Sequence, residues 1–411
     1  MNYELFVAKR IISGKEHKSS ISSPIIKIAI AAISLGVIIM LIAIATGEGL
    51  REKIRSKMSG FKGHIQITKY DANNSDVSVM PISKNQKFYP TFSNIKGIKN
   101  VQVYANQVGL IRTKTDFEGI VFKGVSTDYD WTFFKEYLIA GRIPDFNQKR
   151  TRDVLLSKTI INRLQLQLND TINVTFFKSK ASKLPSNRKL VITGIYNTGF
   201  LEFDKNIMIG DIRQVQRLNR WNENEVGGFE VILENCDELQ QKGAEIYKEI
   251  DATLDATTIA SNYPGLFEWI ELFDNNTWFI IIIMILVAGI NMITALLVLI
   301  LERIPMVGIL KAMGSSNWSI RKIFLYNSSY LIFVGLFWGN LIGLLLLFLQ
   351  KYGGFITLDP ATYYVSEVPI SIDFLTIVFV NIGTLVLCFL MLIIPSVIIT
   401  KIQPSKSIRF A

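Results

Sequence analysis

Four long apolar runs divide the chain into short polar ends and one long mixed segment. The runs are Ile28–Ala45, Trp278–Leu301, Phe324–Leu349 and Phe374–Ile399. A helix that crosses the hydrocarbon layer needs about 20 consecutive apolar residues, because the layer is about 30 Å thick and a helix rises about 1.5 Å per residue. One such run can form a buried core helix, but four in one chain indicate a membrane protein. We therefore expect an α-helical membrane protein with four transmembrane helices.

The segment between the first two runs has the alternating patterns of a folded α+β domain. Its strand candidates are rich in Val, Ile and Phe and are bounded by turn residues; they are Ile65–Thr68, Val101–Thr113, Gly119–Gly124, Asp153–Leu156, Thr171–Phe177, Leu190–Tyr196, Asn206–Ile209 and Phe229–Leu233. Its helix candidates repeat apolar residues every three or four positions; they are Lys158–Leu166, Ile212–Asn219 and Asp237–Ile250. At about 230 residues the segment can bury its own core. We expect an extracytoplasmic α+β domain inserted between the first and second spans.

Both ends of the inserted segment are predicted to be helical. Leu50, Ile54 and Met58 recur at i, i+4 and i+8, so we expect the first span to continue outward as an amphipathic stalk. The apolar and aromatic stretch at 266–273 precedes the second span and fits a second stalk or an interfacial helix. Two stalks can transmit motion between the membrane and the outer domain, or they can simply pack together.

The distribution of Lys and Arg predicts the orientation of the spans, because these residues gather on the cytoplasmic side. The net charge is +10, and the basic residues near span ends are concentrated in three short segments: Lys9, Arg10, Lys15, Lys18, Arg303, Lys311, Arg321, Lys322, Lys401, Lys406 and Arg409. We therefore place both termini and the loop at 302–323 in the cytoplasm, and the inserted domain outside. No block of Lys and Arg with interleaved aromatic residues points to nucleic acid.

These patterns divide the chain into nine expected segments. They are a cytoplasmic N-terminal amphipathic segment at 1–24, a first transmembrane helix at 25–46, the outer α+β domain with its stalks at 47–276, a second transmembrane helix at 277–301, a cytoplasmic loop at 302–323, a third transmembrane helix at 324–350, a short outer loop at 351–372, a fourth transmembrane helix at 373–399 and a cytoplasmic tail at 400–411.

The composition argues against catalysis by this chain. Its cytoplasmic segments are too short to fold as an ATPase or kinase domain, since domains usually exceed about 50 residues. No G-x-x-x-x-G-K-[ST] sequence occurs, and the two histidines, His17 and His64, exclude a multi-histidine metal site and argue against a Ser-His-Asp triad. His64 opens an alternating run and is expected at a surface position of a strand. We expect no bound cofactor or metal, and we expect any energy to come from a partner.

The loop at 302–323 contains the most informative motif, E-R-I-P-M-V-G-I-L-K-A-M-G at 302–314. Val307, Leu310 and Lys311 lie at helical spacing, and Gly314 can end a helix in a left-handed conformation. The motif resembles the E-R-x-x-[ED]-[IV]-x-[IV]-L-[KR]-x-x-G signature of the FtsX-like ABC-transporter permeases, a superfamily that includes MacB, FtsX and the LolC/LolE lipoprotein-release subunits. Met306 departs from the signature, which has an acidic residue there. An ordinary basic turn is the alternative interpretation of the loop.

Other parts of the chain extend this resemblance to its whole length. Val191–Asp204 resembles the V-x-G-[IV]-F-x-x-G-x-x-E-x-D element of LolC/LolE, and Val154–Asp170 resembles their L-G-L-x-x-G-D element, with Asn169 in place of the glycine. Asn291–Ile293 matches a polar break in the second span of the family. Pro395 and Gln403–Arg409 resemble its closing P…P-x-x-A-[IL]-[RK] motif.

The resemblance implies a permease of the inner (cytoplasmic) membrane with its large domain in the periplasm. Such a subunit extracts lipoproteins from the outer leaflet and passes them to a periplasmic chaperone. It pairs with a second permease copy or paralogue and with a LolD-like ATP-binding subunit, which binds ATP and Mg²⁺. The implied partners are thus that ATPase, the second permease, a LolA-like chaperone, the lipoprotein and membrane lipids. A MacB-like exporter of peptides or small molecules, and an FtsX-like mechanotransmitter that controls a cell-wall hydrolase, are the alternatives.

Three sets of site residues follow from the resemblance. The residues expected to couple to the ATPase are Glu302, Arg303, Val307, Leu310, Lys311, Met313 and Gly314. The residues expected to line a lipid cavity between the first two spans are Ile38, Leu41, Ile42, Met284 and Val287, although bulk lipid or a permease partner can also face them. A basic loop at 178–189 stands where LolC has its chaperone-binding hook, and its expected contacts are Lys183, Leu184, Pro185 and Arg188. A plain solvated hairpin loop is the alternative.

Overall fold

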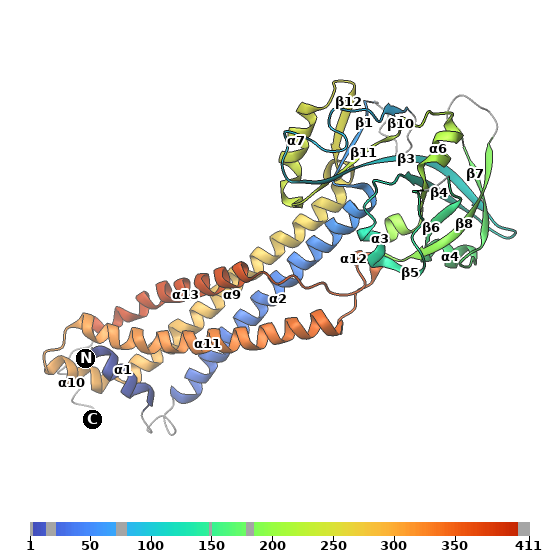
Figure 1. Cartoon of the computed structure of the whole chain (residues 1–411). Coiled ribbons are helices and arrows are strands. Elements are labelled where there is room, and N and C mark those ends of the chain that lie inside the picture. Colours follow the sequence, from blue (N-terminus) through green and yellow to red (C-terminus); the bar gives the residue numbers. More distant parts are fainter. Residues whose placement is uncertain (1–2, 14–21, 71–79, 148–149, 178–184, 402–411) are drawn as a thin grey trace. The chain divides into compact units, whose positions relative to one another are not determined.

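Four helices are long and apolar enough to cross a membrane, which confirms the prediction from the four apolar runs (Figure 1). In this computed structural model, residues 3–13, 22–70, 80–147, 150–177 and 185–401 are described. The candidate spans are Ile26–Lys62, Pro264–Glu302, Asn317–Gly353 and Phe374–Thr400. The chain divides into two units: a helical unit of Met1–Arg51, Ile270–Thr357 and Glu367–Ala411, and an α/β unit of Glu52–Trp269 and Leu358–Ser366.

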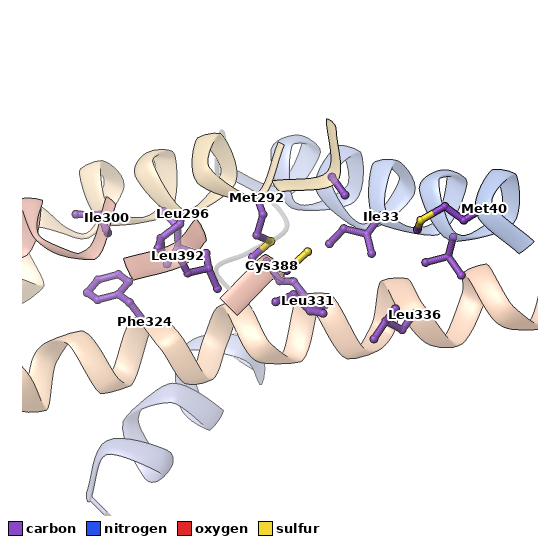
Figure 2. Packing of buried hydrophobic residues seen from close by; sticks show 14 of the residues in the cluster. Ile33, Met40, Met292, Leu296, Ile300, Phe324, Leu331, Leu336, Cys388 and Leu392 are labelled. Atoms are coloured by element: carbon purple, nitrogen blue, oxygen red, sulfur yellow. The ribbon is translucent and has the colours of Figure 1, made fainter. Parts of the chain in front are cut away.

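The helical unit consists of long helices joined by short ones. In chain order they are α1 (Tyr3–Ser13), α2 (Ser22–Lys62), α9 (Pro264–Glu302), α10 (Ile304–Ala312), α11 (Asn317–Gly353), α13 (Phe374–Ser396) and α14 (Ile398–Lys401). Figure 2 shows the buried cluster at which the long helices meet, with Ile33 of α2, Met292 of α9, Phe324 of α11 and Leu392 of α13 among its members. Many apolar residues on the outward faces remain exposed, as lipid-facing residues do.

Helix α11 approaches α2 along a stripe of three glycines spaced four residues apart. A Cβ on Gly335 would lie 2.7 Å from Cγ2 of Ile33, and a Cβ on Gly339 would lie 2.8 Å from Cβ of Val37. The Ser34 hydroxyl also donates a hydrogen bond of 2.9 Å to the Gly335 carbonyl. Small residues at every fourth position allow the backbones of membrane helices to come this close. This stripe was not among the predicted features.

The α/β unit is built on a ten-stranded mixed sheet. Its strands are β1 (Ile65–Lys69), β3 (Ile98–Arg112), β4 (Phe117–Val125), β5 (Leu138–Gly141), β6 (Asp153–Ser157), β7 (Thr171–Phe176), β8 (Ser186–Tyr196), β9 (Ile207–Asp211), β11 (Gly228–Leu233) and β12 (Leu254–Thr258). The order is β12-β1-β11-β3-β4-β9-β6-β8-β5, and β7 bridges β3 and β8. Strands β3, β4, β9, β6, β8 and β7 therefore close a small barrel, in which β4–β9 and β6–β8 are parallel. A separate pair joins β2 (Ile82–Ser83) and β10 (Glu225–Val226).

Short helices complete the α/β unit. They are α3 (Thr132–Tyr137), α4 (Lys158–Leu164), α5 (Leu201–Asp204), α6 (Ile212–Asn219), α7 (Leu239–Glu249), α8 (Ile259–Asn262) and α12 (Pro360–Tyr363), with a 3₁₀ turn at Cys236–Glu238. The eight predicted strands and three predicted helices are confirmed, with ends shifted by a few residues. Strands β2, β5, β10 and β12 were not predicted, because each is short and carries no clear alternation of apolar residues.

The C-terminal end of α2 is fixed in the α/β unit by an aromatic cluster and a buried ion pair. The Phe61 ring packs edge-on against Phe134 with centroids 5.3 Å apart. The Lys123 ammonium of β4 donates to the Phe61 carbonyl and lies 2.7 Å from a carboxylate oxygen of Glu230 on β11. Gln102 donates a further bond of 2.9 Å to Glu230. The ammonium thus satisfies a carbonyl that would otherwise have no partner at the end of the helix.

Candidate functional site

Residues 304–312 of the cytoplasmic loop form a helix, as the spacing of its apolar residues predicts. Helix α10 has Pro305 in its first turn, where the missing N–H has no cost. It ends at Gly314, whose φ of +89° is the left-handed conformation expected from the sequence. The Ser315 N–H donates to the Leu310 carbonyl across this turn and closes the helix end. The segment is therefore a helix and not an ordinary turn, and its coupling role stays a prediction.

The three predicted coupling residues that lie on α10 all contact the helical unit. Val307 is fully buried in the cluster shared with the long helices, and Leu310 packs against the same cluster. The Lys311 ammonium donates a bond of 2.7 Å to the Ile399 carbonyl at the start of α14. These three side chains hold α10 on the helical unit. The contact that the sequence analysis predicted here therefore cannot be made by these three side chains while they hold α10 in place.

The accessible members of the predicted set lie just before and just after α10. Met313 is 77% exposed, and Glu302 and Gly314 are also exposed, while Arg303 is half-buried. Ile309 is 53% exposed on the same helix and was not singled out from the sequence. In the sequence, Ile309 comes two residues after Val307, which places it on the opposite side of a helix, and an apolar residue on that side is the signal that could have identified it.

The five predicted cavity residues do not share one environment. Leu41 is buried and lies 3.1 Å from the position of a Cβ on Gly343, so it packs against α11. Ile38, Ile42 and Met284 are half-buried, and Val287 is exposed on α9. The structure brings α2 and α9 together through Gly36, where a Cβ would lie 3.7 Å from Cε of Met284. Val287 is therefore the member most open to a ligand or partner.

The predicted chaperone loop is shorter than expected from the sequence. Lys183 and Leu184 lie outside the described residues, and Pro185 is exposed. Arg188 was assigned to the loop, and this was wrong: it lies in strand β8, opposite Val174 of β7. The extension of β8 back to Ser186 was missed because polar and basic residues at 186–189 hide the strand pattern.

The Val191–Asp204 element ends in a buried carboxylate that organises a tight turn. Asp204 is fully buried, and its oxygens accept bonds from the Thr198 N–H (3.1 Å), the Thr198 hydroxyl (2.8 Å) and the Gly199 N–H (3.0 Å). Gly199 has a φ of +69°, which an L-residue rarely adopts. Burial raises the pKa of Asp204 to about 6, although these hydrogen bonds act in the opposite direction.

A segment between the third and fourth candidate spans packs against this element. Tyr364, in the stretch 358–366, stacks on Phe200 with ring centroids 5.0 Å apart and meets Trp269 edge-on at 5.7 Å. The buried Lys57 ammonium donates a bond of 2.9 Å to the Tyr364 carbonyl. Tyr364 itself has a φ of +60° at the end of α12. Sequence reasoning treated 351–372 as a plain loop and missed this packing.

Two further residues of the α/β unit, Asn169 and His64, have environments that the sequence did not specify. Asn169, which replaces a glycine of the family pattern, has a φ of +70°, and asparagine tolerates this left-handed conformation better than most residues. His64 was expected at a surface position, and this was wrong: the ring is buried, and Nδ1 accepts a bond of 3.2 Å from the Leu233 N–H. Burial lowers the pKa of His64 to about 4, so the imidazole is neutral at physiological pH.

We expect the substitution Asp204→Asn to remove a pH dependence of stability. The pKa of Asp204 in the folded state, about 6, lies above its ordinary value of 3.8. The folded chain therefore binds more protons than the unfolded chain between these values, and the free energy of unfolding falls as the pH rises from about 4 to about 6. Asparagine keeps the shape but does not ionise, so this fall, of about 2 kcal/mol, should disappear.

Urea unfolding of the full chain in detergent at pH 4, 5, 6 and 7, followed by limited proteolysis of the α/β unit, measures this effect. Asp116→Asn is the matched control, because Asp116 lies exposed in the β3–β4 turn. A slope that is the same in Asp204→Asn and in the unsubstituted chain would contradict the assignment.

Comparison with protein families defines the class of the chain. Residues 28–246 match the MacB-like periplasmic core domain, and residues 278–404 match the FtsX-like permease C-terminal region. The first match includes over half of the chain, and the second includes α10 and the last three candidate spans. A chain with these two modules is an ABC-transporter permease subunit, a class of non-catalytic membrane proteins.

Curated relatives narrow this class. The chain is 22% identical over 424 residues to the lipoprotein-releasing system transmembrane protein LolC of Neisseria meningitidis serogroup B, with 99% of each chain covered. It is 18% identical to the LolE protein of Haemophilus influenzae, again with 99% of each chain covered. It is 22% identical to LolC of Buchnera aphidicola over 93% of this chain and 92% of that relative. The chain belongs to the LolC/LolE family of type VII ABC-transporter permeases.

Among solved structures, the chain is similar to the periplasmic region of MacB from Actinobacillus actinomycetemcomitans. The TM-score is 0.35 at 14% identity, with 53% of this chain and 97% of that chain covered. It is also similar to the extracellular domain of the noncanonic ABC-type transporter YknZ from Gram-positive bacteria, with a TM-score of 0.33 at 13% identity and with 47% of this chain and 99% of that chain covered.

Proposed function

We propose that this chain is the permease subunit of an ABC transporter that extracts lipoproteins from the outer leaflet of the inner membrane and passes them to a periplasmic chaperone. The observation that carries the proposal is the match to LolC over 99% of both chains. In this assignment the α/β unit is a periplasmic domain inserted between the first and second spans. The exporter and mechanotransmitter alternatives have less support, because the full-length relatives are named LolC and LolE.

ATP hydrolysis is assigned to a separate subunit that docks on α10. The helix is short, follows directly from α9 and is anchored by Val307 and Lys311, so a push on its exposed face is passed to the long helices. ATP and Mg²⁺ bind to that partner, and this chain requires no cofactor of its own. A second permease, identical or paralogous, completes the transporter.

The lipid path is assigned to the exposed apolar face of α9. Its members recur at i, i+3, i+4 and i+7 and are Ile283, Leu286, Val287 and Ile290. An apolar stripe that stays uncovered in one subunit suits acyl chains, which require contact with apolar side chains only. In a pair of permeases, the two stripes would form the walls of a path that opens to the bilayer.

We expect the substitution Met313→Glu to uncouple the chain from its ATPase without unfolding it. The side chain is 77% exposed, so folding should change by less than about 0.5 kcal/mol. A charge at the centre of an apolar contact should weaken ATPase binding by about tenfold or more. Affinity copurification of the ATPase with the full chain measures this.

Met80→Glu is the matched control, because Met80 is an exposed methionine of the α/β unit. Equal ATPase recovery from both variants would show that α10 does not form the contact. For the chaperone loop, replacement of residues 183–185, which precede β8, by Gly and Ser should reduce chaperone capture, and unchanged capture would exclude that role.

Depletion of the protein followed by membrane fractionation tests the proposed function as a whole. Lipoproteins destined for the outer membrane should accumulate in the inner membrane. Lipoproteins that still reach the outer membrane at the normal rate would refute the proposal. Copurification of a cell-wall hydrolase with the chain, in place of an acylated protein, would support the mechanotransmitter alternative.

A further inference from the structure

A half-open cavity of about 320 Å³ lies in the helical unit and is lined by α2, α11, α13 and the segment before α13. Leu41 and Ile44 of α2, Leu347 of α11 and Ile377 of α13 form its apolar wall. The cavity is distinct from the exposed α9 stripe assigned to cargo, because α9 contributes none of the residues that line it. An apolar wall of this kind, with polar groups at one end, is typical of a ligand-binding pocket.

One side of the cavity is covered by residues 369–373, the segment that leads into α13, which we call the roof. The Ser371 N–H donates a bond of 3.0 Å to the Ala45 carbonyl, so this segment is tied to α2. At Gly49 of α2 a Cβ would collide with the carbonyl of Pro369, and only glycine permits this close approach. Asp373 caps α13 by accepting bonds of 2.9 Å from the N–H and the hydroxyl of Thr376. These bonds fix the roof in place.

The polar end of the cavity has an excess of negative charge. Arg51 lies 2.6 Å from Glu48 and 3.5 Å from Asp274, and Asp373 forms another part of the wall. Among the residues that line the cavity, the carboxylates of Glu48 and Asp373 and the guanidinium of Arg51 give a net charge of −1. Hydrogen bonding by the Thr376 N–H lowers the pKa of Asp373, so this carboxylate is ionised at neutral pH. The polar end therefore favours a cationic group and disfavours a ligand with a net negative charge.

The position of the cavity along the chain indicates how a ligand would reach it. The first apolar run ends at Ala45, and the fourth begins at Phe374, so the apolar and charged parts meet where these runs end. A molecule that fits both parts is amphipathic and comes from the bilayer. The volume is at the lower end of the range of about 300–1,000 Å³ for ligand pockets, so it accommodates a single acyl chain in part.

We propose that this cavity binds a bilayer phospholipid with a zwitterionic headgroup. One acyl chain lies against Leu41 and Leu347, the phosphate faces Arg51, and the ammonium faces Glu48 and Asp373. The site is distinct from the α9 stripe, because α2, α11 and the start of α13 line it and lipid binding requires no ATPase. Leu41, which the sequence analysis placed at the cargo cavity, lines this site instead. Bound lipid would also raise the thermal stability of the chain, because a ligand that binds the folded state stabilises it.

Lipid retention measures the proposal directly. The full chain is placed in nanodiscs that contain equal amounts of phosphatidylethanolamine and phosphatidylglycerol with identical acyl chains, extracted, and analysed by native mass spectrometry. We expect phosphatidylethanolamine to be retained over phosphatidylglycerol by about tenfold. Equal retention of the two lipids, or preferential retention of phosphatidylglycerol, would overturn the proposal.

Two substitutions with matched controls show whether the retained lipid lies in the cavity. Asp373→Asn preserves an N-cap but removes the charge, and it should reduce the preference about threefold or more, whereas Asp359→Asn, at the N-cap of α12, should not. Ala45→Phe should fill the cavity and abolish retention, whereas Leu345→Phe on the exposed face of α11 should not. Unchanged retention in both cavity variants would overturn the proposal.

A final arm separates bilayer lipid from cargo. The retained phosphatidylethanolamine is challenged with a synthetic triacylated lipopeptide. If the lipid stays bound, the cavity is a phospholipid site. The lipopeptide could instead displace the lipid from the unsubstituted chain and bind equally well to Ala45→Phe. The displaced lipid would then have occupied a cargo site outside the cavity, and the phospholipid assignment would be overturned. Because no transport is measured, failure of the proposed lipoprotein function would not alter this result.

Discussion

Substitution of Gly339 by leucine is expected to prevent formation of the folded helical unit. Even one added carbon would lie 2.8 Å from Cβ of Val37 and 3.0 Å from the Ser34 carbonyl oxygen, and leucine adds three more. Backbone atoms on one side and a β-branched side chain on the other cannot give way without separating α2 from α11. Overpacking of a well-packed core typically costs about 1–3 kcal/mol, and this close helix crossing should place the cost at or above the upper end.

The expected result is loss of a monodisperse peak when the full chain is extracted in mild detergent and examined by size-exclusion chromatography. Gly383→Leu is the matched control: it makes the same change in α13, where a Cβ would have no atom within 4 Å. Normal elution of the Gly339→Leu variant would show that α2 and α11 are not in close contact at this position.

Lys123→Met should be the most damaging single substitution in the α/β unit. The lysine and glutamate side chains of this pair are 3% and 1% exposed, and the ammonium lies 2.7 and 2.8 Å from the two carboxylate oxygens of Glu230. Removing one partner leaves a charge buried without a counterion, which costs about 3–5 kcal/mol. The change also removes the donor to the Phe61 carbonyl at the end of α2.

A double variant distinguishes the ion pair from general packing. Lys123→Met combined with Glu230→Leu removes both charges and should recover most of the lost stability, since a buried pair can often be replaced by apolar residues. Lys53→Met breaks the exposed Lys53–Glu136 pair and should cost less than about 1 kcal/mol. Urea unfolding of the full chain measures all three. A loss in the double variant equal to that in Lys123→Met would contradict the explanation.

Much of the local structure is predictable because it is encoded in short-range patterns. The apolar runs identify four candidate spans, and the spacing of Leu50, Ile54 and Met58 correctly predicts that α2 continues as one helix to Lys62. The predicted core strands alternate clearly enough to be placed within a few residues. Gly314 adopts the left-handed conformation that its position predicts.

Other features depend on pairing between distant segments, which periodicity does not show. Closure of the barrel requires β7 to bridge β3 and β8, and nothing in the sequence of β7 specifies both neighbours. Packing of Tyr364 on Phe200 joins residues over 160 positions apart. The glycine stripe on α11 is different: its G-x-x-x-G-x-x-x-G spacing is visible in the sequence and was available as a signal of close helix packing.

In the candidate sites, too, local patterns were predictable and contacts with distant segments were not. The α10 motif correctly indicated a helix followed by a left-handed glycine, but sequence spacing alone did not separate its buried face, with Val307, from its exposed face, with Ile309. That separation depends on which neighbours cover the helix. The functional roles assigned to the α10, cavity and chaperone-loop residues remain predictions until the variants described above are measured.

The packing of residues 358–366 in the α/β unit has a practical consequence for anyone who excises this domain. A soluble fragment limited to 52–269 would lack Tyr364, so one face of Phe200 and the edge of Trp269 would be open to water. The Lys57 ammonium would also lose its carbonyl acceptor. A faithful fragment therefore needs two pieces of chain, with 358–366 restored through an added linker, although the inserted domain looks contiguous in the sequence.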